Sequence, residues 1–151
     1  MWPFGRRKSV EPNHASRTCS APTEDSLGRR GEHLARQFLR RDHFKILATN
    51  YRCPAGEADL IVLDISTRKT AGAETIVFVE VKTRQNPSNV APESAVNAAK
   101  RQQLRKVARY YLTTRDTQGF ATRFDIIAIL IPPGQEPQIK HIKNAFAMRG
   151  K

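Results

Sequence analysis

Two carboxylates and one lysine stand beside two apolar segments near the middle of the chain. Asp59 precedes the apolar residues 60–63, and Glu80 and Lys82 follow the apolar residues 76–79. Carboxylate oxygens are the ligands that Mg²⁺ and Mn²⁺ prefer in proteins. A lysine next to such an ion can orient a water molecule or stabilise developing negative charge. These residue types therefore indicate a divalent-metal site, provided that the fold brings them together.

The two apolar segments are predicted to pair as an antiparallel β-hairpin. Both have the length of a strand, and the polar, turn-like residues 66–73 separate them. A loop that is symmetric about residues 69 and 70 sets Asp59 opposite Glu80, where two carboxylates repel each other across the sheet. A bound cation would turn that repulsion into a binding site. The same register gives these further pairs: Leu63 with Ile76, Val62 with Val77, Ile61 with Phe78, Leu60 with Val79, Ala58 with Val81, and Glu57 with Lys82.

The elements around the hairpin are predicted from hydrophobic periodicity. They comprise two amphipathic helices and three strands: helices over residues 27–42 and 93–113, and strands over residues 44–51, 123–131 and 138–146. Ser26 is predicted to cap the first helix. Residues 123–131 are apolar on both faces, which favours a central strand reached through a helix crossover. The order αβββαβ, followed by an edge strand, predicts an α/β fold with a central mixed sheet flanked by helices.

The pattern of Asp59 followed by Glu80-Val81-Lys82 resembles that of the PD-(D/E)xK nucleases, also called the restriction-endonuclease-like superfamily. More closely, three strings resemble the YraN-like family of bacterial proteins: Asn50-Tyr51-Arg52, Gly56-Glu57-Ala58-Asp59-Leu60-Ile61, and Phe78-Val79-Glu80-Val81-Lys82-Thr83-Arg84. The similarity extends over most of the chain, from about residue 27 to about residue 131. Ala58 stands where the superfamily's name has proline, at a position that does not touch the ligands.

The resemblance implies a restriction-endonuclease-like core and a metal-dependent endonuclease that hydrolyses DNA phosphodiesters. Asp59 and Glu80 would hold Mg²⁺ or Mn²⁺, and Lys82 would orient the attacking water or stabilise charge. Junction-resolving relatives in the superfamily carry a helix acid, a role that Glu32 would take here, and they make branched DNA a candidate substrate. The YraN-like family is largely uncharacterised, so the alternative is a nucleic-acid-binding module that keeps the fold without the activity. A third interpretation is that these charges only protect a sheet edge.

Several other side chains have two interpretations or a weaker assignment. Glu32 lies at the edge of the first helix's apolar stripe, either as a first-turn acid favoured by the helix dipole or as a third carboxylate of the site. Lys100 lies within the apolar stripe of the second helix, either snorkelling at the edge of the core or directing its ammonium at a phosphate beside the metal. Arg84 and Arg52 are candidates for contacts with nucleic acid. Asp125 is either structural or near the site.

The charge of the chain favours an anionic partner. Its 151 residues, enough for one domain, carry a formal net charge of +12, which favours nucleic acid first and an anionic membrane second. DNA is therefore the expected partner, with RNA also open. Residues 1–25 are predicted to be a disordered polar tail, and residues 26–151 a single nuclease-like domain that keeps 22 basic and 11 acidic residues.

Cysteine content and the absence of long apolar runs favour the cytoplasm. No apolar run approaches the ~20 residues of a transmembrane helix, and the charged N-terminal residues lead into no apolar segment of a signal peptide. Cys19 and Cys53 are too few for a disulfide framework and are expected to be free thiols in a reducing compartment. The chain is therefore expected to be a cytoplasmic protein without membrane association.

Overall fold

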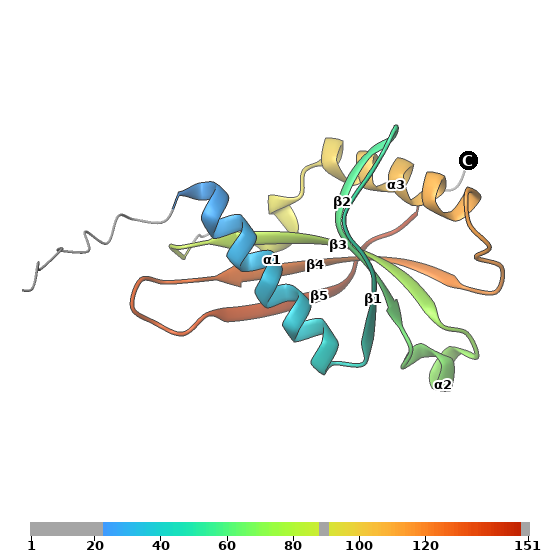
Figure 1. Ribbon diagram of the computed structural model, residues 1–151, viewed down its shortest axis with the longest axis horizontal. Coiled ribbons are helices and arrows are strands. Elements are labelled where there is room, and N and C mark those ends of the chain that lie inside the picture. Colours follow the sequence, from blue (N-terminus) through green and yellow to red (C-terminus); the bar gives the residue numbers. More distant parts are fainter. Residues whose placement is uncertain (1–22, 88–90, 149–151) are drawn as a thin grey trace, which may run out of the picture.

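Five strands form one mixed sheet with helices packed on it (Figure 1). The computed structural model describes residues 23–87 and 91–148, so the predicted tail lies outside the described residues up to residue 22. The elements in chain order are α1 (Glu24–Arg41), β1 (Phe44–Cys53), β2 (Gly56–Asp64), α2 (Thr67–Ala71), β3 (Thr75–Arg84), the 3₁₀ helix η1 (Pro92–Ala95), α3 (Ala98–Thr113), β4 (Ala121–Leu130) and β5 (Gln138–Phe146). The strands follow one another across the sheet in sequence order.

The predicted α/β fold is confirmed. β1, β2 and β3 are successive antiparallel strands, β4 returns parallel to β3 through α3, and β5 pairs antiparallel with β4 at the edge. A parallel pair needs such a crossover because a short turn cannot reverse the chain twice. The arrangement is compatible with a restriction-endonuclease-like core. Two short elements were not predicted: α2 occupies the loop between β2 and β3, and η1 precedes α3.

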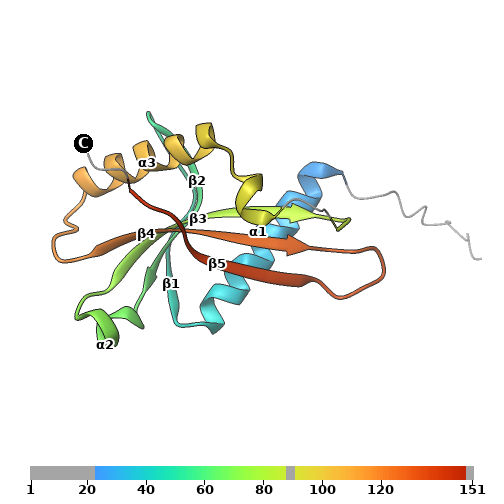
Figure 2. The ribbon, with the colours of Figure 1, turned by 180° about the vertical axis from the view of Figure 1, so that it is seen from behind.

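Two apolar layers join the sheet to its helices. One lies between the sheet and α1 and includes Leu39 and Val79, and the other lies on the α3 side and includes Phe78 and Leu104. Figure 2, seen from behind, shows α3 on the side of the sheet away from α1. Successive residues of β3 point alternately into the two layers, so the strand is buried on both faces until it nears its end. Its last residues emerge from the core beside α1.

The predicted register of β2 and β3 is confirmed over the apolar part of the hairpin. The pairs run from Leu60 with Val79 to Leu63 with Ile76, as the symmetric loop required. The hydrogen-bonded pairing then ends, and the hairpin of β1 and β2 curves away from β3 (Figure 1). The three pairs predicted beyond this point are therefore not part of the ladder. The physical reason is that the Asp59 carboxylate, and not a strand carbonyl, accepts the Val81 backbone N–H at 2.8 Å.

Both long helices begin at a different residue from the one predicted. Thr23, not Ser26, caps α1, since its hydroxyl accepts the Ser26 N–H at 3.3 Å, so residues 24 and 25 belong to the helix and not to the tail. α3 begins at Ala98 and not at residue 93, because the Asn97 side chain accepts the Lys100 N–H at 2.9 Å and caps the helix. Within the described residues, no helix combines the length and apolar character needed to cross a membrane.

A glycine allows α1 to lie close against the end of β3. A methyl group built at Gly31 would lie 1.8 Å from the Thr83 hydroxyl oxygen, much closer than van der Waals contact allows. At Gly28, one turn earlier, nothing lies within 4 Å of such a methyl group. The contact at Gly31 brings the first half of α1 beside the segment that carries Glu80 and Lys82.

Candidate functional site

A cavity of about 840 Å³ opens where β2 and β3 separate. Its walls come from the first half of α1, the start of β2, the end of β3 with the residues after it, and one side chain of α3. The lining includes six residues that the sequence singled out: Glu32, Asp59, Glu80, Lys82, Arg84 and Lys100. Five acidic and three basic residues line the cavity in all, so it is acidic in a chain with a net charge of +12.

Glu80 is the buried centre of the cavity's charges. Its side chain is 3 % exposed, and the Lys82 ammonium lies 2.8 Å from Oε1. Lys100 reaches from α3 to within 3.3 Å of Oε2, which places its ammonium at the site and not in solvent. Oε2 nevertheless has no hydrogen-bond partner among the described residues. Burying a carboxylate is costly, and opposite charge nearby offsets that cost; the two lysines supply this charge.

Asp59 is the second carboxylate, and its environment disfavours its charge. Burial raises the pKa of Asp59 to about 6, and repulsion from Glu80 contributes to the same rise. The Val81 N–H, at 2.8 Å, and the Lys100 ammonium act in the opposite direction. An added positive charge would favour the ionised form of Asp59 and lower its pKa.

The two carboxylates fit a divalent cation of the Mg²⁺ class. Asp59 and Glu80 come from neighbouring strands, face one cavity and repel each other, and Glu80 Oε2 is a buried oxygen without a hydrogen bond. Mg²⁺ commonly keeps several waters and uses only one or two protein carboxylates. The described residues contain no cluster of three His, Cys, Asp or Glu side chains suited to a metal. Glu32 is therefore not a third direct ligand in this arrangement.

Glu32 lines the cavity from α1 and is held there by β1. Its Oε2 accepts a hydrogen bond from the Asn50 side-chain amide at 3.2 Å. The interpretation of Glu32 as a first-turn acid is wrong, because α1 begins at Glu24 and Glu32 lies more than two turns further on. Electrostatic repulsion from Glu32 makes a small contribution to the raised pKa of Asp59. The cavity thus brings the third predicted carboxylate near the other two.

The sequence did not predict a role for Asn50. The residue has a left-handed backbone with φ 47°, and the pairs on either side of it place it across β1–β2 from Asp59. Asparagine adopts this conformation more readily than most residues with a side chain, and such residues often occur at functional sites. The only signal in the sequence was that Asn50 opens one of the strings of the family resemblance, which carried no structural assignment.

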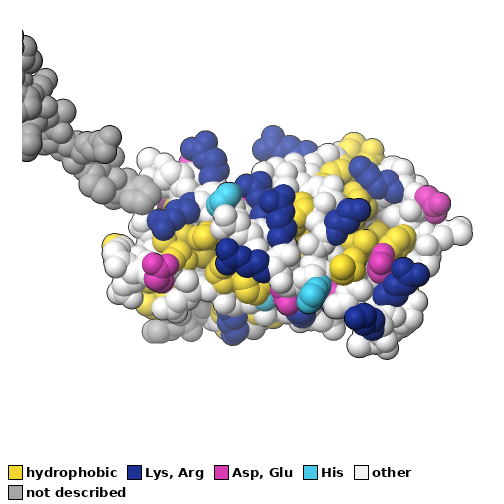
Figure 3. Space-filling model, turned by 60° about the horizontal axis from the view of Figure 1, so that its bottom comes forward, with side chains coloured by type: hydrophobic (Ala, Val, Ile, Leu, Met, Phe, Trp, Pro, Cys, Tyr) yellow, Lys and Arg dark blue, Asp and Glu magenta, His cyan; other side chains and the backbone are white. Residues whose placement is uncertain are grey.

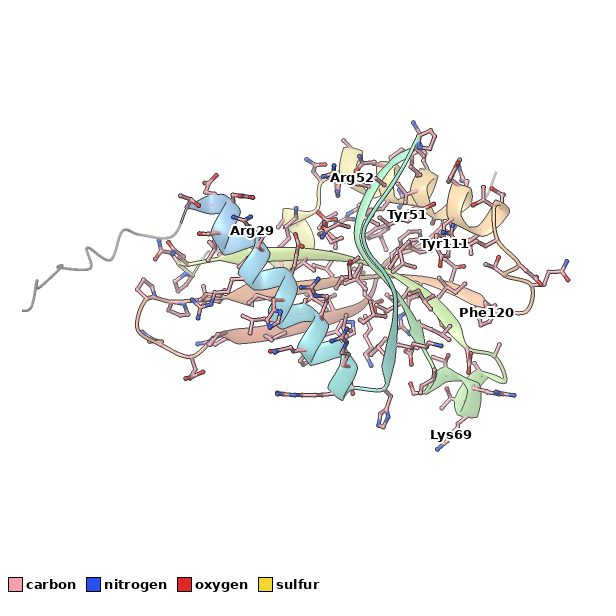
Figure 4. All side chains as sticks on the ribbon, viewed as in Figure 1. Arg29, Tyr51, Arg52, Lys69, Tyr111 and Phe120 are labelled. Carbon is pink, nitrogen blue, oxygen red and sulfur yellow. The ribbon has the colours of Figure 1, made fainter. Side chains whose placement is uncertain are left out.

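The predicted nucleic-acid contacts are not all in one place. Arg84 and Lys100 line the cavity, whereas Arg52 lies outside it on the hairpin of β1 and β2 (Figure 4). Arg52 is exposed and lies 3.5 Å from the Glu57 carboxylate. Its neighbour Tyr51 packs edge-on against Tyr111, with ring centroids 5.3 Å apart, so this tyrosine supports the α3 side of the sheet.

Asp125 is structural and does not line the cavity. Its carboxylate is fully buried and accepts two hydrogen bonds from Arg123, at 2.8 and 2.9 Å. His141 Nε2 lies 2.8 Å from the same carboxylate, and Arg123 also reaches Asp64 at 3.0 Å. Hydrogen bonds from His141 and Arg123 hold the pKa of Asp125 below its usual value, against the effect of burial. This buried network ties β2, β4 and β5 together.

Comparison with known proteins places most of the residues that line the cavity within a recognised family region. Residues 31–129 match the model of "Uncharacterised protein family UPF0102". A UPF0102 protein of Geotalea daltonii is 45 % identical over 121 residues, which cover 80 % of this chain and 89 % of the relative. A UPF0102 protein of Nocardia farcinica is 41 % identical, covering 87 % and 99 % respectively. One of Pelobacter propionicus is 37 % identical, covering 95 % and 94 %. The matched region contains both carboxylates and both lysines of the site.

Proposed function

The chain belongs to UPF0102, the YraN-like family that its sequence resembles, and we propose that it is a metal-dependent nuclease that hydrolyses DNA phosphodiesters. The observation that carries the proposal is the arrangement around Glu80. Two carboxylates on neighbouring strands face one acidic cavity, and two lysines approach Glu80 at 2.8 and 3.3 Å. Acids that can share a cation, beside ammonium groups that can contact a phosphate, are the groups that metal-dependent phosphodiester hydrolysis uses.

Asp59 and Glu80 would hold Mg²⁺ or Mn²⁺ in this proposal. When bound, such an ion supplies a water of lowered pKa and neutralises charge that develops on the phosphate. Asp59 contributes a carboxylate held by the Val81 N–H, so its orientation is set before any ligand enters. Glu80 contributes an oxygen without a hydrogen bond.

The two lysines would have different roles. Lys82 is two residues from Glu80 on the same strand, and it would orient the attacking water or stabilise the developing charge. Lys100 comes from α3 and would contact the phosphate beside the carboxylates. In the metal-free arrangement both ammonium groups neutralise Glu80. An arriving cation would replace part of that neutralisation and leave the lysines available to the substrate.

Nucleic acid is the proposed partner because of the charge distribution. The chain carries 26 basic and 14 acidic residues, a net charge of +12. The excess of acid in the cavity, five acidic against three basic residues, is small beside that net charge. Basic proteins attract polyanions through long-range electrostatics. DNA is the proposed substrate, with branched DNA and RNA as further substrates to test.

A cleavage assay tests the proposal directly. The full chain is incubated with single-stranded, duplex, flapped and four-way DNA and with single-stranded RNA, in Mg²⁺ or Mn²⁺, with EDTA as the control. We expect cleavage of at least one DNA that EDTA prevents and that Asp59→Asn abolishes. Cleavage that survives both EDTA and Asp59→Asn would show a contaminating or different activity.

A specific observation favours a second function, nucleic-acid binding without catalysis. Both oxygens of Glu80 already lie near an ammonium group, so the charge of Glu80 is neutralised without a metal. Isothermal titration calorimetry with Mn²⁺ separates the two functions. Absence of Mn²⁺ binding, together with salt-sensitive DNA binding and no cleavage of any substrate, would favour the binding module.

A further inference from the structure

We propose that the solvent-facing side of α1 is a nucleic-acid contact surface that holds the sugar–phosphate backbone next to the cavity. The inference rests on the proposed function, which it deepens by naming where the substrate lies. The basic side of α1 consists of Arg29, Arg30, Arg36, Arg40 and Arg41, with His33 among them. Figure 3 shows Lys and Arg side chains spread over a face of the molecule that includes this region.

Helical spacing aligns four of these side chains in one row. Arg29, His33, Arg36 and Arg40 are separated by four, three and four residues, which places them on one side of an α-helix. The row spans about 16 Å along the axis. The opposite side of α1 is buried against the sheet at Gly31, Ala35 and Leu39. Arg29, His33 and Arg40 are exposed and Arg36 is half-buried, so the row lies on the solvent side of the helix.

Most of these arginines have no counter-charge among the described residues. Arg29 pairs with Asp25 at 3.0 Å, and both side chains are largely exposed. Arg30, Arg36, Arg40 and Arg41 form no ion pair or hydrogen bond with any other described side chain. Cations gathered on one helix without acidic partners repel one another, so a polyanion would relieve that repulsion. All four are arginines, whose forked guanidinium matches phosphate geometry.

The cavity needs such a surface beside it. Five acidic and three basic residues line the cavity, so by itself it repels phosphate. The α1 residues Leu27, Gly28 and Glu32 form part of the cavity wall, so one helix carries both the wall and the basic row. A sugar–phosphate backbone held on α1 would enter the cavity where Lys82 and Lys100 lie. Binding and chemistry would thus use separate sets of charges.

An anionic membrane is the less suitable partner for this surface. Amphipathic helices that lie on membranes insert a free apolar side between the lipids. The apolar side of α1 is already buried in the core, with Ala35 and Leu39 fully buried. Anionic lipid vesicles nevertheless provide a direct test of this alternative.

The test compares two double variants with equal loss of charge. Arg36→Gln/Arg40→Gln removes two arginines of the row, and Lys69→Gln/Lys106→Gln removes two exposed lysines on α2 and α3. Affinity for a fluorescent DNA duplex is measured in EDTA over a range of salt concentrations, after circular dichroism has shown matched folding. Because EDTA excludes cleavage, the result does not depend on catalysis.

We expect the α1 variant to weaken duplex binding about tenfold at low salt and to reduce the salt dependence by about two ions, while the control changes little. Equal effects of the two variants, or no effect of the α1 variant, would overturn the inference. A third outcome would also overturn the inference: the unmutated protein binds vesicles of phosphatidylserine and phosphatidylcholine but not duplex, and the α1 variant loses this vesicle binding. Cleavage by the unmutated protein without measurable duplex binding would reject the proposed contact surface and leave the proposed nuclease activity standing. Duplex binding through α1 without cleavage would reject the nuclease activity and leave the contact surface standing.

Discussion

The side-chain amide of Asn50 lies 3.2 Å from the Glu32 carboxylate and donates a hydrogen bond to it. The contact joins β1 to α1 beside the cavity. Asn50 also lies across β1–β2 from Asp59. The residue is therefore placed to hold one acid of the cavity while its backbone borders another. Its left-handed conformation, φ 47°, directs the chain away from regular strand geometry at this point.

Substitution of Asn50 can separate its backbone from its side chain. Asn50→Gly tolerates the left-handed backbone and loses the amide, so we expect little change in stability and a several-fold loss of Mn²⁺ affinity and cleavage. Asn50→Ala loses the amide and also strains the backbone, which should cost about 1 kcal/mol more in unfolding free energy. Urea denaturation and calorimetry measure the two effects. If Asn50→Gly binds Mn²⁺ as tightly as the unmutated protein does, the Asn50 amide is not needed to position Glu32.

Asp59→Asn should abolish cleavage and raise the stability of the metal-free protein. The ionised carboxylate is disfavoured by burial and by Glu80, and the neutral amide avoids both effects. Thermal unfolding in EDTA measures the gain. Glu57→Gln is the control, because Glu57 also lines the cavity but lies on the exposed hairpin beside Arg52. A lower melting temperature for Asp59→Asn than for Glu57→Gln would contradict the prediction.

The same carboxylate predicts a pH dependence of stability. The pKa of Asp59 rises from 3.8 to about 6 on folding, so the folded protein binds the proton more tightly than the unfolded chain. The contribution of Asp59 to the unfolding free energy, at most about 3 kcal/mol, is therefore fully present below pH 4 and is lost as pH rises through 6. Urea denaturation from pH 4 to pH 8 should show the unfolding free energy of the unmutated protein falling relative to that of Asp59→Asn. Parallel curves would mean that Asp59 is not perturbed.

The two lysines should differ in catalysis and be redundant in stability. Lys82→Ala should abolish cleavage and Lys100→Ala should weaken it less, while each leaves the fold intact because the other lysine still neutralises Glu80. Removing both leaves a buried carboxylate unpaired, which should cost about 3–5 kcal/mol. Lys106→Ala, on an exposed position of α3, is the control. Additive, small losses of stability in the double variant would show that Glu80 is better solvated than its 3 % exposure indicates.

Gly31→Ala should destabilise the protein by about 1–3 kcal/mol, because the new methyl group collides with Thr83 and pushes α1 from the sheet. Gly28→Ala on the same helix meets nothing within 4 Å and should stabilise it by up to about 1 kcal/mol through helix propensity. Thermal unfolding of the pair measures the contrast. Equal melting temperatures would show that α1 can shift at no cost.

Two apolar segments and a loop taken as symmetric about residues 69 and 70 were enough to predict the register of β2 and β3, including the pair of Ile61 with Phe78. The same pattern could not show where the pairing ends, since that depends on the Asp59 side chain accepting the Val81 N–H. The apolar stripe of α3 correctly indicated burial of Leu104 and Tyr111.

Tertiary contacts overrode the pattern elsewhere. A charged residue such as Arg105 is expected at the surface, but Arg105 is buried, with its guanidinium donating to the Ala147 carbonyl at 2.9 Å and lying over Phe146. The left-handed backbone of Asn50 likewise left no trace in the periodicity. Both depend on segments distant in sequence, which a pattern of neighbouring residues does not report.

The crossover through α3 gives the site an order of assembly. β2 and β3 are joined by a short loop, whereas β4 pairs with β3 only after residues 85–120 have crossed the sheet. Local contacts generally form before distant ones because closing a long loop costs more entropy. Asp59 and Glu80 would then meet before Lys100 arrives. In stopped-flow experiments, Asp59→Asn should accelerate refolding, and Lys100→Ala should mainly accelerate unfolding.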